Sequence, residues 1–276
     1  NRYSSELLGY HEQMVTAVAA NAQYKQIASE GFEDYYYDKA LKKEDPCIHP
    51  KHFPLEFDEA QIVKKSIPDI SAHTGTYYLL VSQNKPVEAN IVYNNCDTMA
   101  NGARIINDSI FNETKVECVN CLGTFTPQPG KYVISAWISR GLNPANTASG
   151  NYIEVYANGT QLLGGFTPEG NNIEGWQRIS GTFVISTGIT SLKVKLLNHE
   201  RGDIGVDDIR IHPFDASFKS YVYDENTLKF TYELDENNYF TKYEYDESGM
   251  LERVKKETER GVMMIQESRF GQQKKL

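Results

Sequence analysis

Short segments with alternating apolar and polar residues dominate the middle of this 276-residue chain. Alternation with period two is the pattern of a β-strand with one buried and one exposed face. Clusters of Gly, Pro and Asn, such as 127–130 and 158–159, separate the segments and favour turns. No helical pattern alternates with them, so the sequence predicts an antiparallel β-sandwich and argues against a parallel α/β sheet. The segments are 77–82, 131–139, 151–158, 177–186, 191–198 and 206–213.

The N-terminal segment, 1–30, does not share this pattern. Residues 1–19 have no clean period, and we expect them to be a tail from a preceding unit. Residues 20–30 contain good helix formers, in which Ala22, Ile27 and Ala28 give a weak apolar stripe. Gly31 is suited to end a helix. The sequence therefore predicts one short helix before a sandwich that spans residues 31–214.

The last part of the chain, 215–276, repeats a tyrosine-rich pattern. A Tyr-x-Tyr-Asp segment begins at Tyr221, and a second one begins at Tyr243. Each is followed by turn residues and a new apolar strand start, which is the pattern of a β-hairpin. We expect the two hairpins to pair with each other. Two hairpins bury little core, so they should dock on the sandwich or on neighbouring repeats of a longer chain.

Composition narrows the class of partners. The chain has 28 basic and 37 acidic residues and a net charge of −9, with the basic residues scattered, which argues against nucleic acid. No apolar run reaches the roughly 18 residues of a membrane span. The 18 tyrosines favour an extracellular all-β module. The chain begins at Asn1 without a leader pattern, so we expect it to be a segment of a longer protein.

The four cysteines leave several interpretations open. They could form two disulfides in an oxidising compartment or simply be buried thiols. The Cys118-Val-Asn-Cys121 spacing also permits a metal or redox site, to which His49 and His52 could contribute. No second tight pair supports that site, so buried or disulfide-bonded cysteine is the better interpretation. The residues are Cys47, Cys96, Cys118 and Cys121.

The hairpin pattern resembles the YD repeat of bacterial rearrangement-hotspot proteins. The segment Tyr243-Glu-Tyr-Asp246 with Gly249 matches it well, whereas the first unit has Thr227 where a Gly is usual. The resemblance covers about the last fifth of the chain. It implies hairpins that stack into large extracellular shells, with neighbouring repeats of the same long chain as partners.

The central block resembles the jelly-roll carbohydrate-binding modules attached to bacterial xylanases and glucanases. Three short motifs occur in the order found in those modules, and two tryptophan segments also match. The resemblance implies a jelly-roll sandwich, a possible polysaccharide ligand and a secreted or surface-attached bacterial protein. The motifs are Gly31-Phe-Glu33-Asp34, Ser71-Ala-His-Thr74-Gly75-Thr76-Tyr77 and Val206-Asp207-Asp208-Ile209; the tryptophan segments are Gly175–Arg178 and Tyr132–Trp137.

The same resemblance implies a structural Ca²⁺ ion, held by Glu33, by carbonyls of the turn at Gly75 and Thr76, and by Asp207. Hard oxygen ligands of this kind suit Ca²⁺. We expect Asp208 to point to the opposite face, because successive strand residues alternate. Without the motif order, the acidic residues would be interpreted as solvated strand ends.

A sugar platform needs exposed aromatic rings. Tyr152, Glu154 and Tyr156 alternate with apolar residues that belong to the core, so the three could form a ligand-binding row. Alternatively, these tyrosines pack against the hairpins or the N-terminal segment, which we slightly favour. Trp137 and Trp176 lie in apolar segments and are expected in the core.

Enzyme motifs are missing from the sequence. There is no G-x-S-x-G or H-E-x-x-H motif, and residues 123–131 only mimic a phosphate-binding loop. Asp207 and Asp208 are adjacent strand residues and cannot flank one glycosidic bond. The sequence therefore indicates a non-catalytic, Ca²⁺-stabilised binding module, or alternatively a structural spacer that supports a repeat shell without any glycan ligand.

Overall fold

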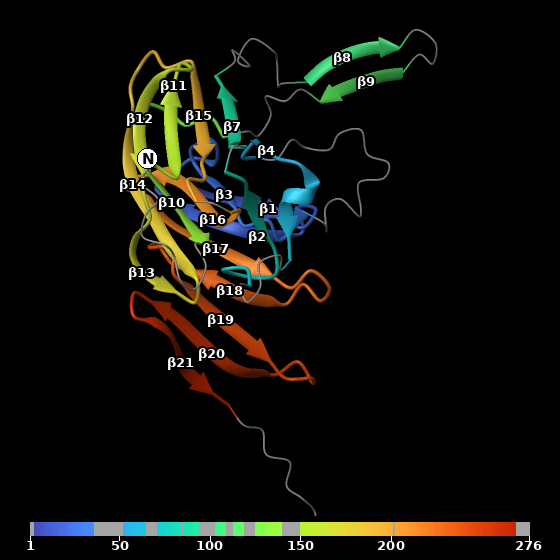
Figure 1. The fold of residues 1–276 in the computed structure, drawn as a ribbon. Helices are drawn as coiled ribbons and strands as arrows, with labels where there is room; N and C mark the ends of the chain where they lie inside the picture. Colours follow the sequence, from blue (N-terminus) through green and yellow to red (C-terminus); the bar gives the residue numbers. More distant parts are fainter. Residues whose placement is uncertain are drawn as a thin grey trace, which may run out of the picture.

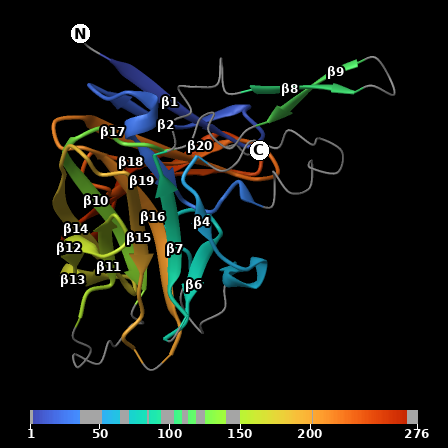
Figure 2. The ribbon, with the colours of Figure 1, turned by 90° about the horizontal axis from the view of Figure 1, so that it is seen from above.

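The structure, a computed structural model, describes residues 3–35, 52–64, 71–83, 85–93, 103–108, 113–118, 125–139, 150–200 and 202–268. The strands form four sheets: two that face each other, one seven-stranded sheet beside them, and a two-stranded pair of β8 (Ala103–Asp108) and β9 (Glu113–Cys118) (Figures 1 and 2). Cys47, Cys96 and Cys121 lie outside the described residues, so the disulfide and metal alternatives for the cysteines stay predictions.

The two facing sheets make a β-sandwich. We call them the inner sheet, with order β13-β14-β10-β16-β6-β5 and β3 beside β16, and the outer sheet, with order β12-β11-β15-β7-β4. The inner strands are β3 (Ala28–Glu30), β5 (Ile62–Val63), β6 (Tyr78–Val81), β10 (Gly130–Ser139), β13 (Glu169–Ile173), β14 (Trp176–Ile185) and β16 (Ile204–Pro213). The outer strands are β4 (Leu55–Glu56), β7 (Val87–Val92), β11 (Ile153–Ala157), β12 (Gln161–Phe166) and β15 (Ser191–Leu196). The chain crosses repeatedly between the sheets, which is the course of a jelly roll, and the predicted antiparallel sandwich is confirmed.

The apolar half of the alternating pattern fills the space between these sheets. Ile134 and Ile138 of β10 meet Ile153, Val155 and Ala157 of β11 in one cluster of fully buried side chains. Because successive strand residues point to opposite faces, Glu154 and Tyr156 of β11 lie on the outside of the sandwich. The position of the core therefore follows from the sequence pattern.

The third sheet, which we call the hairpin sheet, joins both ends of the chain. Its order is β1-β2-β17-β18-β19-β20-β21. The tyrosine-rich hairpins pair with each other as predicted, with Tyr232 opposite Lys242 across the junction. The strands are β1 (Ser4–Gly9), β2 (Met14–Ala20), β17 (Ser217–Tyr223), β18 (Phe230–Leu234), β19 (Phe240–Tyr245), β20 (Leu251–Thr258) and β21 (Gly261–Glu267).

The predictions for the N-terminal segment are wrong. The expected tail forms the β1-β2 hairpin, which adds to β17 through Ala19 opposite Phe218. The expected helix is replaced by a single 3-10 turn, η1 (Tyr24–Gln26), followed by β3. Tertiary pairing overrides helix propensity here, because Ala28 lies opposite Ile211 in the inner sheet and is buried. Among the described residues, helical structure is limited to η1 and η2 (Glu59–Gln61), and no helix is long and apolar enough to cross a membrane.

Three aspartates hold the turns of the hairpin sheet. Asp224, Asp235 and Asp246 are evenly spaced along the sequence. The Oδ1 atom of each carboxylate accepts hydrogen bonds from backbone N–H groups two to four residues further on. The middle turn was not predicted, although Asp235 carries the same signal as the other two. In the first turn Leu228 has the positive φ of 52° that Gly249 supplies in the third, so Thr227 does not need to be glycine.

The hairpin sheet docks on the face of the inner sheet that points away from the sandwich core (Figure 1). Trp137 and Trp176 are buried as predicted, but on this face rather than between the two sandwich sheets. The Nε1 of Trp137 donates to the carbonyl of Asn238 at 2.7 Å. The guanidinium of Arg210, 1% exposed, donates to the carbonyl of Asp235 at 2.6 Å. The hairpin turns are thus held by side chains of the sandwich.

Candidate functional site

The predicted Ca²⁺ ligands come together around the turn before β6. Glu33 is buried, and its Oε1 accepts hydrogen bonds from the backbone N–H groups of Thr76 at 2.7 Å and Tyr77 at 2.6 Å. Gly75 has φ +62°, and a Cβ atom there would lie 2.2 Å from the Glu33 carboxyl carbon. Only glycine allows the turn to close on this carboxylate.

Asp207 reaches the same turn from β16. Its side chain is fully buried, and Oδ2 accepts from the N–H groups of His73 at 3.0 Å and Thr74 at 3.3 Å. Oδ1 accepts from the N–H of Asp208 at 2.8 Å. Segments far apart in sequence are therefore joined at one turn, in the order that the motifs suggested.

Burial raises the pKa of both Glu33 and Asp207 well above the usual range. Repulsion from Asp208 adds to this shift in both cases, and Glu33 also repels Asp207. The charges that perturb these two carboxyls are all negative, so ionising both of them is unfavourable, and a bound cation would favour their ionised form.

The donor set fits Ca²⁺ in kind. Glu33 and Asp207 supply carboxylate oxygens, and carbonyl oxygens of the turn at Gly75 and Thr76 could complete the 6–8 oxygen ligands that Ca²⁺ takes. Within the described parts of the chain, no group of three or more His, Cys, Asp or Glu side chains is arranged to hold a metal ion. A site here would therefore depend on backbone carbonyls beside two carboxylates.

Asp208 does not point away from the turn, as strand alternation predicted. It lies at φ 49°, and the register of β16 against β10 shifts beside it. Its carboxylate accepts from the Thr74 hydroxyl at 3.0 Å and contacts His73 Nδ1 at 2.7 Å. Both aspartates therefore contact the same turn, because the irregular backbone breaks the alternation.

His73 links this turn to the hairpin sheet. Its Nε2 lies 3.1 Å from the Glu257 carboxylate of β20, and its ring stacks on Trp137 with centroids 4.1 Å apart. Burial lowers the pKa of His73, but the nearby charges of Glu257 and Asp208 raise it more, to about 9. The ring lies between two carboxylates, one from each sheet, and both favour its protonated form. No sequence pattern predicts this contact, because Glu257 gives no local signal.

The three residues of the predicted ligand-binding row do not lie on one face in the structure. Tyr152 is 2% exposed and belongs to the sandwich core, where its hydroxyl donates to Glu200 at 2.6 Å. It precedes β11 and does not continue the outward face of that strand. Packing against the hairpins or the N-terminal segment, our preferred alternative, is also wrong for Tyr152. Glu154 and Tyr156 do lie on the outward face, and the Tyr156 hydroxyl donates to Glu154 at 2.7 Å.

Polar side chains continue from these two residues across the outer sheet. Lys195 lies opposite Glu154, and Lys193 lies opposite Tyr156. Both lysines pair with Glu88 of β7, at 3.2 and 2.9 Å respectively. The Lys195 ammonium also lies 5.5 Å from the centre of the Tyr156 ring. The outward face thus presents one aromatic ring within a network of hydrogen-bonding groups.

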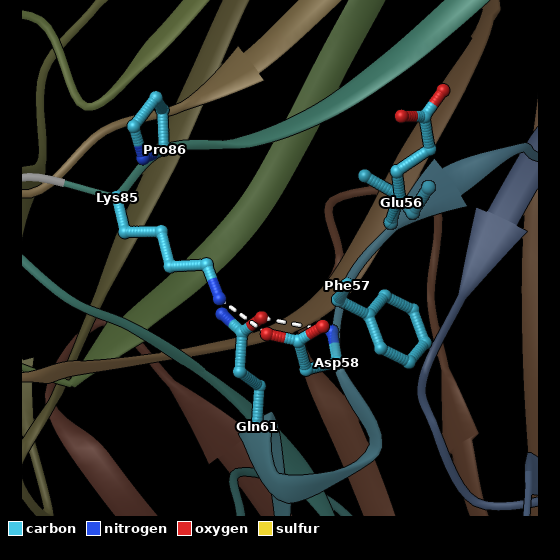
Figure 3. A pocket seen from close by; sticks show the side chains of 7 residues that line it. Glu56, Phe57, Asp58, Gln61, Lys85 and Pro86 are labelled. Atoms are coloured by element: carbon cyan, nitrogen blue, oxygen red, sulfur yellow. Dashed lines mark hydrogen bonds and ion pairs between the residues drawn. The ribbon is translucent and has the colours of Figure 1, made fainter.

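A groove of about 440 Å³ lies at the edge of the outer sheet beside β4 (Figure 3). Lys85 forms an ion pair with Asp58 across it, and the side chain of Gln61 accepts from the N–H of Asp58 at 2.9 Å. These polar groups of the groove bind one another, and no sequence pattern predicts the groove. The lining residues are Leu55, Glu56, Phe57, Asp58, Gln61, Lys85 and Pro86.

Comparison with the models of known protein families gives no match, and comparison with curated proteins also gives none. Among solved structures, the chain is similar to the C-terminal CBM6 module of LamC, a marine laminarinase from Zobellia galactanivorans. The two are 16% identical, the similarity covers 45% of this chain and 98% of that one, and the TM-score is 0.22. At that score no conclusion about a ligand follows, so the functional argument depends on the chain itself.

Proposed function

We propose that this chain is a non-catalytic binding module that holds a polysaccharide on the outward face of the outer sheet. The observation that most supports this proposal is that the hairpin sheet covers only one of the two outward faces of the sandwich. The hairpin sheet covers the outward face of the inner sheet and buries Trp137 and Trp176 there. The outward face of the outer sheet instead carries Glu154, Tyr156 and the neighbouring lysines.

Sugar rings suit such a face for two physical reasons. The flat face of the Tyr156 ring can stack on the apolar C–H surface of a pyranose ring. Carboxylate and ammonium groups of Glu154, Lys193 and Lys195 can exchange hydrogen bonds with sugar hydroxyls. Since these groups are already ordered by one another, binding would cost little side-chain entropy.

We further propose that Ca²⁺ stabilises the module at Glu33, Asp207 and the carbonyls of Gly75 and Thr76. When bound, the ion would stabilise the ionised form of both carboxyls. Glu33 and Asp207 already orient the turn through its backbone N–H groups. The role is structural, since the turn and the proposed glycan face belong to different sheets of the sandwich.

Glycan retention in affinity gels that contain neutral polysaccharides tests the binding function. The Tyr156→Ala variant should lose retention while its melting temperature stays close to that of the wild type, because the ring lies on an outward face. Tyr24→Ala is the matched control, since Tyr24 is 42% exposed and belongs to the turn before β3. Retention that survives Tyr156→Ala would contradict this location of the site.

The alternative function is a structural spacer that supports a shell of YD-repeat-like hairpins in a large secreted or surface bacterial protein. In this role the module would rely on the buried contacts of Arg210 with Asp235 and of His73 with Glu257, which join the hairpin sheet to the sandwich. Neighbouring repeats would then extend the sheet. Absence of retention for every polysaccharide tested, with an intact fold, would support this spacer role.

A further inference from the structure

The last strand of the hairpin sheet has one free side. β21 pairs with β20 from Gly261 opposite Thr258 to Glu267 opposite Arg253, and no described strand pairs with its other side (Figure 1). The backbone N–H and C=O groups on a free edge can pair with another strand.

The side chains of β21 favour the addition of another strand at this edge. Met263, Met264 and Ile265 are 54%, 52% and 57% exposed, the only three consecutive large apolar residues that are exposed in the described parts of the chain. Protected edges carry Lys, Pro or bulges. β21 contains no Lys, Arg or Pro, and its pairing with β20 is irregular only at Ile265. At the opposite end of the sheet, β1 begins with the polar residues Ser4, Ser5 and Glu6. The two ends of one sheet therefore differ in the side chains that they offer to an added strand.

We propose that β21 is a dimerisation edge, at which a second copy of this chain adds its own β21 in antiparallel orientation. The apolar run from Met263 to Ile265 is centred on Met264. In that register Met264 faces Met264 of the second copy, and Met263 faces Ile265 of the second copy. Cross-strand pairs of apolar residues stabilise a sheet, and an isologous contact of this kind closes after two copies.

Charge at the ends of the strand agrees with this register. Glu267, which pairs with Arg253 of its own chain, faces Gly261 of the second copy next to Arg260, so no like charges lie directly opposite each other at either end. Pairing of β21 with β1 of a second copy fits less well, because the polar residues Ser4, Ser5 and Glu6 would then meet the apolar run. Such a contact would also be open-ended and form filaments.

Sedimentation of the whole chain across a concentration series tests the proposal. One strand pair is a small interface, so we expect a reversible monomer–dimer equilibrium between roughly 5 and 200 µM. Met264→Lys should remove the dimer, because two lysines would meet at the symmetry axis. The matched control Val184→Lys replaces an apolar residue that is 54% exposed on β14, and it should leave the equilibrium unchanged.

A charge-swap mixture makes the test specific to this register. Met264→Lys and Met264→Glu should each be monomeric alone, and an equimolar mixture should form a heterodimer. Circular dichroism and melting of each variant check that the fold is intact, which is expected because Met264 is half exposed. A wild-type chain that stays monomeric over the whole range would overturn the proposal and leave the edge to neighbouring repeats. A wild-type dimer that persists in Met264→Lys, or a mixture that stays monomeric, would also overturn it.

Discussion

The sandwich and the hairpin sheet are both antiparallel β structure, but they are stabilised in different ways. In the sandwich, two sheets enclose a large apolar cluster that includes fully buried residues such as Ile134, Ile153 and Val155. The hairpin sheet has two smaller clusters: one of six buried residues around β1, β2 and Phe218, and one of three, Val222, Leu234 and Phe240. A sheet needs a second layer to bury its apolar face. The hairpin sheet therefore depends on the sandwich for much of its order.

The contacts between the two regions differ in chemistry from the contacts within the sandwich. Several are hydrogen bonds from buried side chains to hairpin turns, such as Trp137 to Asn238 and Arg210 to Asp235. The His73 contact joins an imidazolium to carboxylates on both sides. Buried polar groups are costly when a partner is removed. The apolar core therefore sets the stability of the sandwich, whereas polar contacts of buried side chains help to fix the hairpins to it.

The strongest test removes the sandwich altogether. A peptide of residues 217–267 contains the five strands β17 to β21 but lacks the layer on which they pack. We expect it to be largely unstructured in water, because Trp137, Trp176 and their neighbours are missing. Amide chemical shifts measured by NMR check this. Sharp, dispersed signals would show that the hairpin sheet is autonomous, and the comparison between the two regions would fail.

The second test removes one docking side chain from the intact chain. His73→Ala leaves Asp208 and Glu257 buried without their cationic partner, and breaking a buried pair in this way usually costs about 3–5 kcal/mol. Hydrogen exchange should become faster in β19 to β21, with a smaller change in the sandwich core. His199→Ala is the control, since His199 is exposed and lies in the sandwich. Equal acceleration in both regions would show that the two unfold as one unit.

These tests also separate what the sequence could predict from what it could not. The sandwich strands follow from local alternation, as in Ile153, Val155 and Ala157, since every second residue must enter the core. The turn around Glu33 and Asp207 was found only through the order of three motifs. The contact between His73 and Glu257 joins residues 184 positions apart and leaves no trace in either segment.

Errors arose where tertiary contacts override local preference. Residues 20–30 have helix formers but become β3, because β16 offers an edge for Ala28. Tyr152 follows the alternation of β11 by count, yet it lies just outside that strand and enters the core. Asp208 lies at a backbone irregularity, where counting residues along an ideal strand does not give the direction of a side chain.

Metal addition tests the sandwich without touching the hairpins. If Ca²⁺ binds at Glu33 and Asp207, a hundredfold excess over Kd should add about 2.7 kcal/mol to the free energy of unfolding. The melting temperature should then rise with Ca²⁺, and Asp207→Asn should abolish the response. Asp203→Asn, at an exposed position of the preceding loop, should keep it. Equal melting of the wild type in EDTA and in Ca²⁺ would rule out a stabilising site.

The smallest expected effect is a pH dependence that belongs to the hairpin turns. Burial raises the pKa of Asp224, but hydrogen bonds from Thr227 and Asn226 lower it more, so the net pKa lies below its usual value. A carboxylate with a lowered pKa in the folded chain contributes stability above its unfolded value of about 3.9, and this contribution is lost as the pH falls below that value. Asp224→Asn keeps the turn geometry but cannot ionise, so the stability advantage of the wild type over this variant should shrink between about pH 5 and about pH 2.5. Denaturant unfolding at several pH values measures the difference, and a constant advantage across that range would show that the charge of Asp224 does not stabilise the hairpin.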